Sequence, residues 1–267
     1  MSNEKKPAKA AGKAKTIEPA AAVAEAAAPQ AAVPARGMPP MYSGVEALSA
    51  QRHGSMKLAP RSGFAHAAGM SSILVAASEV PAAARDYPVV FSDRENDSMA
   101  YAVTGYAEGV NIHVDSEGAW RKDAYIPAFV RRYPFIFIES EGGKRMTLGV
   151  DPKALSEEKG SAIYEADGQP SQTTKNALAF CSAYRNEMDR TRVLVQQIIA
   201  SGITISRRAD VNLPGGKKAM IGGFRIVDEK KLSELPDDAF LEMRRTGALT
   251  LVYCHLMSMA SWRNILA

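Results

Sequence analysis

Cysteine and long apolar runs are scarce in this chain of 267 residues. The two cysteines, Cys181 and Cys254, form no CxxC pair and have no Cys/His spacing typical of a metal site. Such usage is typical of a reducing compartment, or of a surface protein that does not rely on disulfides. No segment reaches the roughly 18 apolar residues that a membrane-spanning helix needs, so the sequence predicts no membrane span.

A surplus of charge is also nearly absent once the N-terminus is set aside. The formal net charge is +4, and residues 1–36 hold six basic and three acidic residues, which leaves +1 for the rest. A surface that follows a nucleic-acid backbone needs clustered Lys and Arg, so we expect no nucleic-acid binding by the body of the chain. The basic N-terminal segment is compatible with contact to nucleic acid or to a membrane surface, or with a solvated extension.

The first 40 residues are rich in Ala, Lys and Pro and contain no aromatic residue. They hold too little bulky apolar surface to offset the entropy lost on ordering, so the sequence predicts a disordered tail over 1–40. The Ala-rich run is interrupted by Glu25 and has no Leu, Ile or Phe, so it does not resemble a secretory signal peptide. We expect a single α+β domain over 41–267.

An internal repeat is predicted in the first half of that domain. VPAAARDYPVVF (80–91) and IPAFVRRYPFIF (126–137) align at an offset of 46 residues with six identities in twelve positions. We expect repeat units at about 80–125 and 126–171, which makes this half rich in strands. In each unit a proline begins a helical turn, and the Tyr-Pro step then starts a strand covered on both faces.

The second half, about 172–267, shows helical periodicity. A helix of about 28 residues is expected between an N-cap at Ser171 and a C-cap at Gly202. Pro214-Gly215-Gly216 predicts the turn of a β-hairpin. Two C-terminal helices follow, of which the first begins at Pro236 and ends at Gly247. Helices without strict βαβ alternation predict an α+β fold.

Well-marked catalytic and metal-binding signatures are missing. The sequence contains no P-loop, GxSxG, HExxH or GxGxxG motif. The acidic loop at Asp93–Asp97 has Ser98 and Thr104 where an EF-hand needs Gly and Glu. His255 lies on an apolar helical segment, where a buried, hydrogen-bonded histidine is the favoured interpretation. We therefore predict no cofactor, no metal and no catalytic residue.

The stretch 124–137 is interpreted as a scaffold element used twice, and a ligand groove is the alternative. In such a groove Arg85 and Arg131 would face an anion, and Trp120 and Tyr125 would form an aromatic wall. The candidate groove residues are Arg85, Trp120, Tyr125, Arg131, Tyr133 and His255.

An enzyme whose site is assembled from distant residues stays open as a third alternative. It would gather Arg131, Tyr133, Trp120 and His255 in one pocket. Replacing Arg131 with Ala should then abolish ligand binding without lowering thermal stability.

Several ordered segments carry a family resemblance. They are SILV (72–75), YPVVF (87–91), WR (120–121), YIPAF (125–129), RYPF (132–135), GFRIVD (223–228) and GAL (247–249), followed by Tyr253, His255-Leu256 and Ser258. On these segments, residues 41–267 resemble the bacterial SapC family.

That resemblance implies a role more than a mechanism. The family takes its name from surface-layer (S-layer) proteins of Gram-negative bacteria, and its relatives tend to be encoded beside TonB-dependent receptors. The expectation is a noncatalytic surface-layer or envelope-associated protein that acts through protein or glycan contacts. The alternative is a cytoplasmic ligand-binding or accessory protein linked to receptor uptake, which the absence of a signal peptide favours. Localisation is thus open between cell surface and cytoplasm.

Overall fold

The computed structural model describes residues 40–94, 98–140, 145–212 and 218–266. All of the described residues belong to one compact unit. The predicted disorder of the N-terminal tail therefore lies outside the described residues, apart from Pro40.

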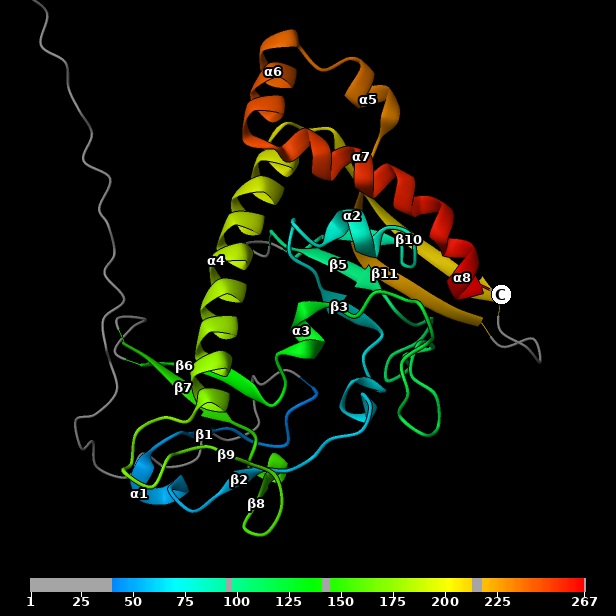
Figure 1. Ribbon diagram of the computed structural model, residues 1–267. Helices are drawn as coiled ribbons and strands as arrows, with labels where there is room; N and C mark the ends of the chain where they lie inside the picture. Colours follow the sequence, from blue (N-terminus) through cyan, green and yellow to red (C-terminus); the bar gives the residue numbers. More distant parts are fainter. Residues whose placement is uncertain (1–39, 95–97, 141–144, 213–217, 267) are drawn as a thin grey trace, which may run out of the picture. The chain divides into compact units, whose positions relative to one another are not determined.

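A five-stranded antiparallel sheet forms the centre of the described chain (Figure 1). Its strands, in spatial order, are β10 (Thr204–Asn212), β11 (Lys218–Val227), β4 (Val89–Ser92), β5 (Ala100–Val103) and β3 (Ser72–Leu74). All four residues of β4, the middle strand, are buried, as its continuous apolar run predicts.

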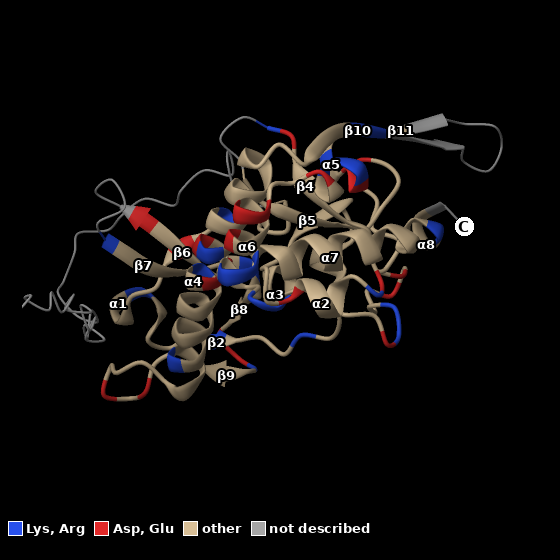
Figure 2. Cartoon of the chain, turned by 90° about the horizontal axis from the view of Figure 1, so that it is seen from above, with Lys and Arg blue, Asp and Glu red and all other residues tan. Residues whose placement is uncertain are grey.

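Helices α2 (Val80–Ala83) and α7 (Ala248–Ser258) pack together, and α7 contacts β4 and β11 of this sheet (Figure 1). No Lys, Arg, Asp or Glu occurs in α7, which is why it is tan along its length in Figure 2. Gly247 joins α7 to α6 (Asp237–Thr246) with a φ of 90°, a left-handed conformation that favours glycine. The predicted end of the first C-terminal helix at Gly247 is confirmed, because Gly247 is the C-cap of α6.

The predicted pair of C-terminal helices corresponds to α6 and α7. Two shorter helices, α5 (Glu229–Ser233) and α8 (Arg263–Leu266), were not predicted. Pro236 is the N-cap of α6, so the helix begins at Asp237, one residue after the predicted start. The predicted hairpin is present as β10 and β11, but its Pro-Gly-Gly turn lies outside the described residues.

Two small sheets complete the first half. One contains, in spatial order, β1 (Glu46–Ala47), β7 (Arg145–Val150) and β6 (Phe135–Ser140), and the other β8 (Leu155–Ser156), β2 (Lys57–Leu58) and β9 (Ser161–Ala162). The remaining short elements are the helices α1 (Ala50–His53) and α3 (Ala128–Arg131) and the 3₁₀ turns Ala65–Ala67, Pro152–Ala154 and Met259–Trp262. Helices combined with antiparallel sheets confirm the α+β class.

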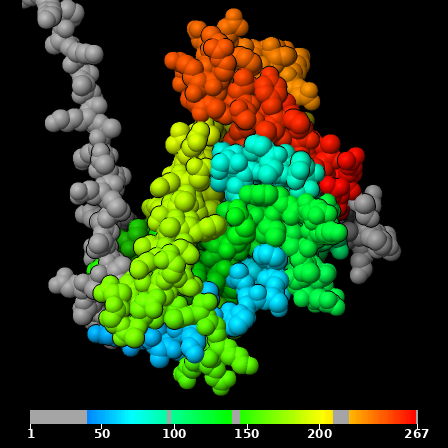
Figure 3. All heavy atoms as spheres, viewed as in Figure 1, coloured from blue at the N-terminus to red at the C-terminus, as the bar shows by residue number. Residues whose placement is uncertain are grey.

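The long helix α4 (Gln172–Ala200) begins where the sequence predicts. The Ser171 hydroxyl accepts a hydrogen bond from the Thr174 N–H, and Gly202 follows the last turn with a φ of 77°. The buried face includes Cys181 and Ile198, at the spacing that the apolar pattern predicts. Figure 3 shows the outer face of α4 as a continuous yellow-green surface that ends at the C-terminal helices.

The internal repeat is not confirmed. Both segments do contain a helical turn followed by two antiparallel strands, α2–β4–β5 and α3–β6–β7. The two strand pairs belong to different sheets, however, and among the described peptide bonds only Tyr133–Pro134 is cis. Both faces of β6 pack against hydrophobic clusters, Ile136 and Ile138 on one face and Phe135 and Phe137 on the other, although residues 136–138 are only partly buried.

Candidate functional site

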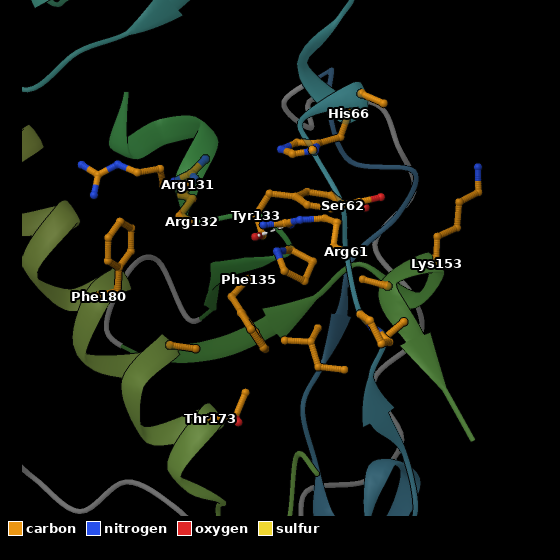
Figure 4. Close-up of a pocket in the computed structure, with 18 of the residues that line it drawn as sticks. Arg61, Ser62, His66, Arg131, Arg132, Tyr133, Phe135, Lys153, Thr173 and Phe180 are labelled. Carbon is orange, nitrogen blue, oxygen red and sulfur yellow. Dashed lines mark hydrogen bonds between the residues drawn. The ribbon is translucent and has the colours of Figure 1, made fainter. Parts of the chain in front are cut away.

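A pocket of about 600 Å³ lies between α4 and the loop that follows β2 (Figure 4). It is lined by residues 58–63, 65–66, 131–135 and 153–154 and by Thr173, Asn176, Ala177 and Phe180. Volumes of 300–1,000 Å³ are usual for small-molecule sites.

None of the described helices is both long and apolar enough to cross a membrane.

Tyr133 stands at the centre of this pocket. Its ring stacks on His66, with 4.2 Å between the ring centres and 15° between the planes, and its hydroxyl donates to Asp151 over 3.2 Å. Arg61 Nη1 donates to the Tyr133 carbonyl over 2.6 Å, as the dashed line in Figure 4 shows. The Arg61 guanidinium also lies 5.0 Å from the centre of the Tyr133 ring. Side chains from two other segments of the chain therefore hold the ring in place.

Asp151 does not line the pocket, but it holds the Tyr133 hydroxyl in place. It is 1% exposed, and its carboxylate accepts hydrogen bonds from the Ser43 N–H (2.8 Å), the Ser43 hydroxyl (2.6 Å) and the Lys153 N–H (3.0 Å). These donors satisfy the oxygens of the buried carboxylate. It ties the start of the described chain to the end of β7, next to Tyr133.

Among the described residues, four cationic side chains and no carboxylate line the pocket. They are Arg61, Arg131, Arg132 and Lys153. Apolar side chains such as Phe135, Ala177 and Phe180 form much of the remaining wall. Positive charge on an apolar wall favours a ligand that carries both negative charge and apolar surface.

Arg131 has partners inside the protein. It forms an ion pair with Glu79 (3.5 Å), donates to the Tyr125 hydroxyl (3.3 Å), and lies over the Phe180 ring at 5.6 Å. Glu79 is buried and also accepts from the Tyr125 hydroxyl (2.7 Å) and the Ala128 N–H (2.6 Å). This network holds α3 against the start of α2.

Burial sets the protonation of the ring groups in the pocket. It lowers the pKa of His66 to about 4, with a further contribution from the nearby Arg61 cation. Burial also raises the pKa of Tyr133 to about 12, and the neighbouring Asp151 carboxylate adds to the effect. At neutral pH the stacked pair is therefore uncharged, and the cations supply the charge of the pocket.

Only two of the six predicted groove residues, Arg131 and Tyr133, line this pocket. Tyr125 does not line the pocket, but its hydroxyl accepts a hydrogen bond from Arg131. Trp120 lies in the core, where its Nε1–H donates to the Tyr87 hydroxyl over 3.1 Å. Arg85 is exposed and does not line the pocket. The structure thus does not join Arg85 and Trp120 with Arg131 in one groove.

His255, the sixth candidate, is a residue of α7 and is fully buried in the core. Its Nδ1–H donates to the Val89 carbonyl over 2.6 Å, and its Nε2 accepts from the Val227 N–H over 3.0 Å. Burial lowers its pKa to about 4, so the imidazole is neutral. Both ring nitrogens are used to connect α7 to β4 and β11, a structural arrangement.

The pocket residues that were not predicted from the sequence include Arg61, His66, Lys153 and Phe180. The first three lie in loops or short turns with no periodic pattern, and Phe180 reads as one more apolar residue of α4. Arg132 was overlooked although it lies next to Arg131. Within the described residues, no group of three or more His, Cys, Asp or Glu side chains could hold a metal ion.

The fold and this site define an α+β protein with a cationic, partly apolar ligand pocket. A model of the SapC family matches residues 48–265, so the chain belongs to the SapC family. All pocket-lining residues fall inside that range. Nothing matches among curated proteins or among solved structures.

Proposed function

We propose that this SapC-family chain is a noncatalytic binding protein whose pocket takes an acidic glycan, such as a uronic acid unit. One observation carries the proposal: four cations line the pocket and no carboxylate neutralises them from within the lining. A sugar acid has a carboxylate for those cations and C–H faces for the apolar wall. The pocket volume of about 600 Å³ suits a ligand of one or two sugar units.

The lining supports binding more than catalysis. It contains no carboxylate and no thiol, and glycoside hydrolysis in most families uses a pair of carboxyl groups. His66 is stacked on Tyr133, and its lowered pKa of about 4 makes it a poor base at neutral pH. An enzyme with a dispersed site is therefore the weaker alternative.

Calorimetric titration with glucuronic acid, and with glucose as the neutral match, tests the proposal. We expect glucuronic acid to bind and glucose to bind more weakly by at least about tenfold, because only the acid neutralises the cations. Added salt should weaken the binding. Equal affinity for both sugars would contradict the proposal.

Two lysine variants supply the matched control. Lys153→Gln removes a cation that lines the pocket, whereas Lys159→Gln removes an exposed cation that does not line it. We expect Lys153→Gln to weaken glucuronic acid binding about threefold to fivefold, and Lys159→Gln to leave it unchanged. Equal effects of the two variants would mean that net charge alone attracts the ligand.

The place where the protein acts separates the two roles implied by the family. An envelope or surface-layer role requires an exposed protein, whereas an accessory role in receptor-linked uptake fits the cytoplasm. External protease treatment of intact cells, followed by fractionation, distinguishes them. Digestion supports the surface role, and protection with recovery in the soluble fraction supports the accessory role.

A further inference from the structure

The guanidinium of Arg132 is surrounded by aromatic rings instead of carboxylates. Its central carbon lies 4.5 Å from the centre of the Phe129 ring, 4.9 Å from that of Tyr184 and 6.0 Å from that of Tyr42. Ring faces attract a cation, but they do not neutralise its charge. Its Nε is buried and has no hydrogen-bond partner within the described residues.

The neighbouring arginine shows the contrast. Arg131 has the buried Glu79 as its counter-ion, whereas in the described part of the chain no carboxylate forms an ion pair with Arg132. Leaving a buried charged donor unpaired costs free energy, typically more than for a neutral group. Arg132 is therefore a cation without an ion-pair partner among the described residues. Glu139 lines the same smaller cavity, but its carboxylate pairs with Arg185 at 2.7 Å.

The position of Arg132 gives a ligand access to it. It lines the 600 Å³ pocket and also a smaller neighbouring cavity of about 200 Å³. The Phe129, Tyr184 and Tyr42 rings around the guanidinium restrict its orientation. A donor whose direction is fixed before the ligand arrives loses little entropy on binding.

We propose that Arg132 is the residue that binds the oxyanion of the pocket's ligand, a carboxylate or a phosphate group that accepts hydrogen bonds from the guanidinium and neutralises its charge. The inference rests on the proposed function and assigns the negatively charged end of the ligand to one residue. Arg131, which is already paired with Glu79, then contributes mainly to the shape of the pocket.

Three arginine variants test the assignment with glucuronic acid and glucose 6-phosphate as probes. Arg132→Met keeps an unbranched apolar stem among the rings, and Arg132→Lys keeps the charge but has no guanidinium. Arg192→Lys is the matched control, because Arg192 is exposed and lines neither cavity. We expect affinity to fall at least about tenfold in both Arg132 variants and to stay unchanged in Arg192→Lys.

Two further readouts separate binding from a purely structural role. Thermal unfolding of Arg132→Met should occur at the same temperature as in the parent protein or higher, because the variant removes a buried unpaired donor. The Nε–H resonance of Arg132, assigned by its loss in the variants, should shift on titration with the probe that binds. The probe with the larger effect identifies the oxyanion as a carboxylate or a phosphate.

The outcomes distinguish the two proposals. If the parent protein binds glucuronic acid or the phosphate, but the Arg132 variants keep full affinity or the Nε–H resonance does not move, the assignment to Arg132 is wrong and the proposed function stands. If neither probe binds the parent protein at millimolar concentration, the proposed function is wrong and the assignment falls with it.

Discussion

His113 and His255 are both almost fully buried, but of the two rings only that of His255 has hydrogen-bond partners among the described residues. Neither ring nitrogen of His113 has a partner within the described residues, although the ring lies 4.7 Å from that of Tyr87 and 6.4 Å from that of Trp120. A neutral imidazole always carries one N–H donor, so one donor here is unsatisfied. The aromatic surroundings would suit an apolar ring equally well.

We predict that His113→Phe raises the free energy of unfolding by about 1 kcal/mol, because it removes an unsatisfied buried donor and keeps the ring contacts. His255→Phe should lower it by about 2–4 kcal/mol, because the Val89 carbonyl and the Val227 N–H would lose their partner. Urea unfolding at pH 7 measures both. A loss of stability in His113→Phe would show that the ring has a polar partner, such as an internal water.

Three arginines, Arg85, Arg131 and Arg132, show which parts of the site were predictable from the sequence. Arg131 and Tyr133 were found because their stretch resembles residues 80–91. Arg85 matches Arg131 in that alignment, yet it is exposed and its surroundings are different. The absence of a counter-ion at Arg132 depends on the positions of rings far away in the sequence, such as Tyr42 and Tyr184, so no local pattern reveals it.

At the scale of elements, the start of α4 depends on one serine. The Ser171 hydroxyl donates to the Ala162 carbonyl over 2.6 Å and accepts from the Thr174 N–H over 3.3 Å. It therefore caps the helix and ties it to β9. Because Thr173, Asn176 and Ala177 line the pocket, this cap also positions one wall of the site.

We predict that Ser171→Ala lowers the free energy of unfolding by about 1 kcal/mol, because the cap and the bond to β9 are both lost. Ser201→Ala at the other end of α4 is the control, since the Ser201 hydroxyl only donates to the Ile198 carbonyl in its own helix. It should cost less than about 0.5 kcal/mol. Equal losses in urea unfolding would contradict a special role for the N-terminal cap.

Elements with local signals were predicted well, and those that depend on distant pairing were not. The capped helix α4 and the β10–β11 hairpin have caps, periodicity and turn residues within a few positions. The two-residue strand β2 instead exists because Lys57 and Leu58 pair with both β8 and β9, about a hundred residues later. The two segments 80–91 and 126–137 share local signals, but pairing partners placed them in different sheets.

At the scale of the whole described chain, the two halves meet in one sheet. Phe224 and Arg225 of β11 pair with Ser92 and Phe91 of β4. The Asp93 carboxylate adds an ion pair to Arg225 at 2.8 Å. The stability of the central sheet therefore depends on both halves, and a change in either should affect the same unfolding transition.

Acid should weaken this transition. Burial lowers the pKa of both His113 and His255 to about 4, whereas a histidine in the unfolded chain titrates near pH 6.5. Between these values the unfolded state binds more protons, so stability is fully present above about pH 6.5 and is lost as pH falls toward 4. Each residue contributes a slope of about 1.4 kcal/mol per pH unit.

Urea unfolding at pH 7, 6 and 5 measures this slope, and His113→Phe should reduce it by about 1.4 kcal/mol per pH unit because one titrating group is gone. Comparing the variant with the parent protein cancels the contribution of the carboxylates. An unchanged slope would mean that His113 does not resist protonation in the folded state.

The pocket brings together chain from Leu58 through Phe180, and its walls come from a loop, a helical turn, two 3₁₀ turns and the first turns of α4. No short fragment of the protein contains the whole site. Under the proposed function, a bound ligand would contact these segments at once and would stabilise the assembled pocket. Hydrogen exchange of amides in α4, measured with and without glucuronic acid, would report that stabilisation directly.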